Sequence, residues 1–92
     1  MGEVVPTIAI FFGIVVRMWH DDHPPPHIHV EYQGFEALVV IQTGEISQGT
    51  LPRKVAAIVK EWCLVHQGEL MNNWHKAQRF EPLDRIQGAD RD

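Results

Sequence analysis

The chain has 92 residues, 45% of them apolar, which predicts one domain with a single core and excludes a disordered segment. Its formal net charge of −4 argues against a dedicated nucleic-acid-binding protein, because such proteins usually carry a basic excess. The lone Cys63 cannot form an internal disulfide, no basic secretory leader is visible, and the apolar run 8–16 is too short for a membrane helix, so we expect a cytoplasmic protein.

The first half of the chain predicts an antiparallel sheet. Segments rich in β-branched and aromatic residues alternate with glycine-containing turns, which is the pattern of consecutive strands. The predicted strands are 7–12, 14–19, 27–32, 35–41 and a short one at 45–48. Each is linked to the next by a short turn except the second and third, which are joined by a loop over residues 20–26.

The turns also predict how the strands pair. A two-residue turn at Gln33-Gly34 makes a hairpin with one apolar face, on which the expected pairs are Tyr32 with Phe35, Val30 with Ala37 and Ile28 with Val39. Symmetric closure of the loop 20–26 would place Trp19 opposite His27 and Arg17 opposite His29. A loop of that length does not fix the register by itself.

From Pro52 the pattern becomes helical. Val55, Val59, Trp62 and Leu70 fall on one apolar stripe of a helix, with the polar His66 at its centre. The expected fold is therefore α+β, with an antiparallel four- or five-stranded meander sheet (about residues 7–48) packed on one long C-terminal helix (about 53–78). Residues 1–78 form the predicted domain, and residues 79–92 form a polar C-terminal tail whose few apolar side chains could pack on the body.

Histidines cluster in the loop between the second and third strands. Four of them fall within ten residues: His20, His23, His27 and His29. His27 and His29 are two apart on a predicted strand, so they project from the same face with Cα atoms about 6 to 7 Å apart. That spacing allows two nitrogens to bind one ion, or an acid and a base to flank a scissile bond. His23 could supply a third ligand, with Asp22 or Asp21 as a carboxylate. Such a set favours zinc, or iron, manganese or nickel if the geometry is octahedral.

The same residues also have purely structural interpretations. Histidines on the outer face of a sheet can simply face solvent, and an aspartate before a proline turn commonly bonds the backbone two residues on. His66 is either a core histidine bonded to a sheet carbonyl or part of a polar pocket with Glu69 and Asn73. The candidate residues are His27 and His29 for catalysis, His23, His27 and His29 for a metal, and Arg17, Trp19, Asp22, His66 and Glu69 for binding.

The run Asp22-His23, then Pro25-Pro26-His27-Ile28-His29, resembles the signature of a family of small bacterial proteins called domain of unknown function 4160. The likeness covers roughly residues 6 to 75, and it continues through Pro6-Thr7-Ile8, Phe12-Gly13-Ile14, Glu36-Ala37, Gly44-Glu45, Leu51-Pro52, Trp62, His66, Glu69, Leu70 and Trp74. The family often has another residue where His20 stands, so the resemblance makes His20 a poor candidate for a shared site.

The resemblance implies a partner more than a reaction. The family has no established activity, but its members often occur in small gene pairs similar to toxin–antitoxin modules. We therefore expect a protein-binding component of a two-gene module that binds a second small protein or another copy of itself. The alternative is a small metal-dependent or histidine acid–base hydrolase or nuclease that uses the loop of His23, His27 and His29, with Arg17 on a phosphate. A transcriptional regulator is the third hypothesis, and the acidic charge favours it least.

Overall fold

A five-stranded antiparallel sheet forms the first half of the chain, as predicted. In the computed structural model, which describes residues 5–90, the strands lie side by side in chain order. They are β1 (Thr7–Phe11), β2 (Ile14–Arg17), β3 (His27–Tyr32), β4 (Phe35–Val40) and β5 (Ile46–Gly49). The first four residues of the predicted domain and the last two of the predicted tail lie outside the described residues.

The register of the central strands agrees with the hairpin that the sequence predicts. Tyr32 pairs with Phe35, Val30 with Ala37 and Ile28 with Val39. Arg17 lies opposite His29, also as predicted. Strand β2 ends at Arg17, so the predicted pair of Trp19 and His27 does not form part of the sheet.

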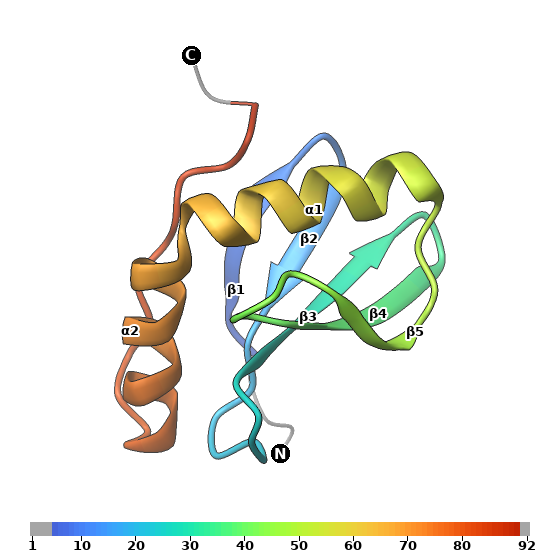
Figure 1. Cartoon of the computed structure of the whole chain (residues 1–92). Helices are drawn as coiled ribbons and strands as arrows, with labels where there is room; N and C mark the ends of the chain where they lie inside the picture. Colours follow the sequence, from blue (N-terminus) through green and yellow to red (C-terminus); the bar gives the residue numbers. More distant parts are fainter. Residues whose placement is uncertain (1–4, 91–92) are drawn as a thin grey trace.

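The single long C-terminal helix of the prediction is wrong, because the segment forms two helices. Helix α1 (Arg53–Val65) and helix α2 (Gln67–Gln78) are separated by His66, whose φ of −105° and ψ of 25° end the first helix. A straight helix over the whole segment would be about 39 Å long, whereas the longest dimension of the folded chain is 33 Å. Helix α1 lies across one face of the sheet, and α2 turns steeply away from it past the β1 side (Figure 1). Neither helix is long and apolar enough to cross a membrane, and residues 5–90 contain no other.

The core lies between the inner face of the sheet and the two helices. Side chains from β1 to β4 and from both helices are buried there. Asn73 is a buried polar residue of α2, and His27 at the start of β3 is also buried. Its large apolar members are Ile8, Phe11, Ile14, Met18, Ile28, Ile41, Leu51, Trp62, Leu70, Trp74 and Ile86. Within residues 5–90, no helix lies over the opposite face of the sheet (Figure 1).

The segment 79–90 has no helix or strand, but it is fixed to the body. The Ile86 N–H donates to the Ile8 carbonyl at 2.8 Å, which places the segment along β1. The Asn73 side chain bonds both backbone groups of Asp84, each at 2.9 Å. Ile86 is 4% exposed. The residues predicted as a polar tail therefore pack on the domain and complete its core.

Candidate functional site

The loop between β2 and β3 is held in place by the C-terminal end of α2. Asp21 adopts a φ of 56°, a left-handed conformation that aspartate tolerates better than most residues. The Asp21 N–H donates to the Ala77 carbonyl at 3.2 Å, and Gln78 Nε2 donates to the Asp22 carbonyl at 3.1 Å. These bonds turn the loop back so that the Asp22 side chain faces the start of β3.

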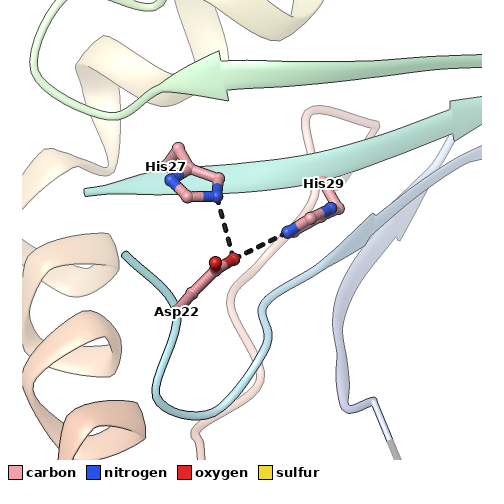
Figure 2. Close-up of side chains that lie close together, drawn as sticks. All are labelled: Asp22, His27 and His29. Carbon is pink, nitrogen blue, oxygen red and sulfur yellow. Dashed lines mark hydrogen bonds and ion pairs between the residues drawn. The ribbon is translucent and has the colours of Figure 1, made fainter. Parts of the chain in front are cut away.

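Asp22, His27 and His29 converge at this point (Figure 2). Asp22 Oδ2 lies 2.9 Å from His27 Nε2 and 3.0 Å from His29 Nε2. One potential ligand atom from each residue lies within 4.8 Å of the other two. The side chains of Asp22 and His27 are 17% and 9% exposed, and that of His29 is 25% exposed. The cluster is therefore largely withdrawn from water but can be reached from the His29 side.

The proton on His27 can be assigned from its neighbours. Nδ1 lies 2.8 Å from the Pro25 carbonyl oxygen, and because a carbonyl only accepts, Nδ1 must carry a hydrogen. In the neutral ring Nε2 is then an unprotonated acceptor facing the Asp22 carboxylate at 2.9 Å. Two acceptors at that distance repel unless a positive species lies between them, either a second proton on the ring or a metal cation. Metal-binding histidines commonly have their other nitrogen held by a carbonyl in this way.

The charge of Asp22 is set by competing effects. Burial alone would raise its pKa, but the hydrogen bonds with His29 and with the His23 backbone N–H oppose this, as does attraction to His27 and His29 when protonated. The net result is a pKa below the ordinary value of 3.8. Asp22 is therefore a carboxylate at neutral pH, as a metal ligand must be.

The third member of the cluster is Asp22 and not His23. The predicted set of metal ligands was His23, His27 and His29, but the His23 side chain is exposed and only its backbone N–H contacts Asp22, at 2.9 Å. The sequence placed both residues in the same loop, and spacing alone could not choose between them. Asp22 Oδ1 accepts from the backbone N–H of the next residue, His23, whereas the prediction was a bond two residues on, and Oδ2 faces the histidines.

His66 and Glu69 form a separate pair at the break between the helices. His66 Nδ1 lies 2.6 Å from Glu69 Oε1, and the His66 ring lies 5.3 Å from the ring of Trp62. His66 is half-buried and is not bonded to a carbonyl of the sheet. The predicted pocket forms only in part, because Asn73 bonds the C-terminal segment instead. These residues do not join the cluster of Asp22, His27 and His29.

Arg17 and Trp19, the other candidate binding residues, flank the cluster on the outer face of the sheet. Arg17 lies opposite His29 and forms an ion pair with Glu31 at 2.5 Å. Its Nε also donates to Thr7 Oγ1 at 3.3 Å. Trp19 is 41% exposed, and its ring lies 5.3 Å from the His29 ring.

A hollow of about 430 Å³ opens on this outer face beside the cluster. Trp19, His29 and Leu38 contribute to its walls, together with the charged side chains of Glu31 and Glu36. His29 thus belongs both to the cluster and to the hollow, so the accessible side of the cluster faces the uncovered face of the sheet.

Two supporting groups could not be found from the sequence. The Trp74 ring packs on the His27 ring at 5.5 Å, and the Pro25 carbonyl fixes its proton. The prediction placed His27 on the solvent side, away from the helix, but His27 is buried because α2 turns past the end of the sheet. No residue pattern within 53–78 signals that turn, so contact between Trp74 and the histidine strand was not predictable.

The fold and site define a class: a small α+β domain with an Asp–His–His cluster where a proline-rich loop meets a meander sheet. Residues 13–75 match the family model described as domain of unknown function (DUF4160), and the chain belongs to this family. The match covers the loop, the sheet from β2 onward, all of α1 and the first three quarters of α2. Searches of curated proteins and of solved structures gave no match.

Proposed function

We propose that this protein binds a divalent metal ion, zinc in the first place, through Asp22, His27 and His29. The observation that carries the proposal is the convergence of Asp22 Oδ2 and the two Nε2 atoms. Two ligand atoms bound to one ion at about 2.0 to 2.2 Å lie about 2.8 to 3.1 Å apart in octahedral geometry and about 3.3 to 3.6 Å apart in tetrahedral geometry. The separations of 2.9 and 3.0 Å from Asp22 Oδ2 fall in the octahedral range, and tetrahedral zinc requires each to widen by a few tenths of an ångström.

Three protein ligands leave a coordination position open, which is typical of catalytic zinc sites and not of structural ones. The open side faces the hollow, because His29 is the most exposed member of the cluster. This arrangement supports the hydrolase hypothesis in its metal-dependent form. The nuclease version has less support, because Arg17 is already paired with Glu31 and would have to leave it to contact a phosphate.

Calorimetric titration of metal-free protein with zinc, manganese and nickel chlorides tests the proposal. We expect one equivalent of metal to bind to the wild type, and Asp22→Asn or His29→Ala to weaken binding by at least about tenfold. His23→Ala is the matched control, because it removes an exposed histidine of the same loop outside the cluster. An absence of binding heat in the wild type, or equal weakening by His23→Ala, would contradict the proposal.

A second role, partner binding, is favoured by a separate observation. Trp19 is 41% exposed beside a hollow on a sheet face that no helix covers, and exposed aromatic residues are enriched at protein interfaces. This is the expected role of a protein-binding component of a toxin–antitoxin-like module. Co-purification with a co-expressed short protein encoded beside it tests the role. Trp19→Ala should abolish the complex, and a complex that survives this change would place the interface elsewhere.

A further inference from the structure

The outer face of the sheet carries an unfavourable pair of like charges. Glu31 on β3 lies directly opposite Glu36 on β4, and like charges in that position destabilise a sheet. Arg17 offsets one of them through its ion pair with Glu31. Glu36 is exposed, and none of the ion pairs found within residues 5–90 includes it. The fold thus retains an uncompensated carboxylate at the wall of the hollow.

The surroundings of these carboxylates fit one kind of side chain. Leu38 and Trp19 line the same hollow, so an acidic pair lies beside an aliphatic surface and an exposed aromatic ring. Lysine and arginine place a charged end on an apolar stem, and a cation is attracted to the face of a tryptophan. The net charge of −4 adds long-range attraction for a basic partner.

We propose that the hollow binds a short basic segment of a partner protein, with a lysine or arginine side chain between Glu31 and Glu36. The inference rests on the proposed partner-binding role and does not require a metal at the neighbouring cluster, with which the hollow shares His29. It assigns the partner a charge opposite to that of this chain and places the contact on strands β2 to β4. A second copy of this acidic chain fits the face less well, because its own charge has the same sign.

The test is a titration of ¹⁵N-labelled protein, followed by NMR, with a short peptide of alternating lysine and valine. Its analogue with glutamate in place of lysine and a mixed-sequence DNA duplex are the comparison probes. We expect amide shifts on β2 to β4 with the lysine peptide alone. Glu36→Gln should weaken binding about threefold, and Trp19→Ala about tenfold. Glu61→Gln, an exposed site on α1 with the same change of charge, is the matched control and should leave the affinity unchanged.

Each contrary outcome has a distinct meaning. Equal weakening by Glu61→Gln and Glu36→Gln would reduce the binding to general charge attraction and overturn the inference. Shifts around the exposed Phe12 and Val65 would overturn this placement but leave partner binding itself standing. Shifts on β2 to β4 that follow dilution, or that DNA produces, would assign the face to a second copy or to nucleic acid. If Trp19→Ala abolishes co-purification while Glu36→Gln has no effect on either assay, partner binding stands and the basic segment is wrong.

Discussion

At the scale of single residues, the properties of the site depend on which atom of His27 faces Asp22. The Pro25 carbonyl holds the Nδ1 proton, so Nε2 faces the carboxylate and needs a positive species between them. His29 makes the same contact from the same face of β3, and it is the more exposed of the two. The pair was predictable, because a strand places residues two apart on one face. Asp22 was not fixed by the sequence pattern, since the path of the loop depends on its bonds to α2.

Asp22 should make stability depend on pH in the metal-free protein. Its pKa is lower in the folded chain than the ordinary value of 3.8, so the unfolded chain takes up the proton first as pH falls. The stabilisation is therefore present above pH 3.8 and is lost as the pH falls through the folded-state pKa. Denaturant unfolding with a chelator present, from about pH 6 to about pH 3, measures it. The difference in unfolding free energy between wild type and Asp22→Asn should shrink toward low pH, and a constant difference would contradict the assigned interactions.

At the scale of elements, the break at His66 determines what α2 contacts. Because α2 turns away from α1, it buries Leu70 and Trp74, places Trp74 on His27 and anchors the loop through Gln78. The sequence predicted the helical residues but not the break, since the apolar stripe continues through His66 with the period of one helix. The break is a consequence of tertiary packing, because a straight helix of about 39 Å would exceed the 33 Å length of the folded chain and must turn to bury its second half.

Gly68→Ala should stabilise the protein. Gly68 lies in the first turn of α2, and an added Cβ would meet no heavy atom within 4 Å beyond its chain neighbours and the nearby backbone of its own helix. Alanine in place of a helical glycine raises the free energy of unfolding by about 0.5 to 1 kcal/mol. Urea denaturation measures the change. A loss of stability would mean that this position needs the freedom of glycine, contrary to its helical conformation.

Gly49→Ala should have the opposite effect at the end of β5. Gly49 has a φ of 83°, and an added Cβ would lie 2.2 Å from the Glu36 carbonyl oxygen. Backbone strain alone costs about 1 to 3 kcal/mol, and the clash adds to it. Gly34→Ala is the matched control, with a φ of 87° but open space around the Cβ. Thermal unfolding should show a larger loss for Gly49→Ala, and equal losses would contradict the close approach of β4 and β5.

At the scale of the whole molecule, the C-terminal segment closes the fold. Trp62 Nε1 donates to the Gln87 carbonyl at 2.8 Å. The Ile86 N–H donates to the Ile8 carbonyl on β1, which is an edge strand of the sheet. The sequence pattern indicated a polar tail, because apolar residues there are few and follow no period. Their packing depends on the edge of β1 and on the position of α2, neither of which a local pattern contains.

Ile86→Ala should therefore destabilise the whole domain. The side chain is 4% exposed. The substitution removes the Cγ1, Cγ2 and Cδ1 atoms, and the loss of such buried atoms lowers the free energy of unfolding by about 2 to 5 kcal/mol. The exposed neighbour Arg85→Ala should change stability by less than about 0.5 kcal/mol. Urea unfolding of the two variants compares them directly. Similar small changes in both would mean that the segment contributes little to the fold.

The metal site is tested most directly by anomalous diffraction at the zinc absorption edge, from crystals grown with one equivalent of zinc. We predict one peak within about 2.0 to 2.2 Å of Asp22 Oδ2, His27 Nε2 and His29 Nε2. A map without a peak at this position, or with the peak at His23 or between His66 and Glu69, would contradict the proposal that Asp22, His27 and His29 form a metal site.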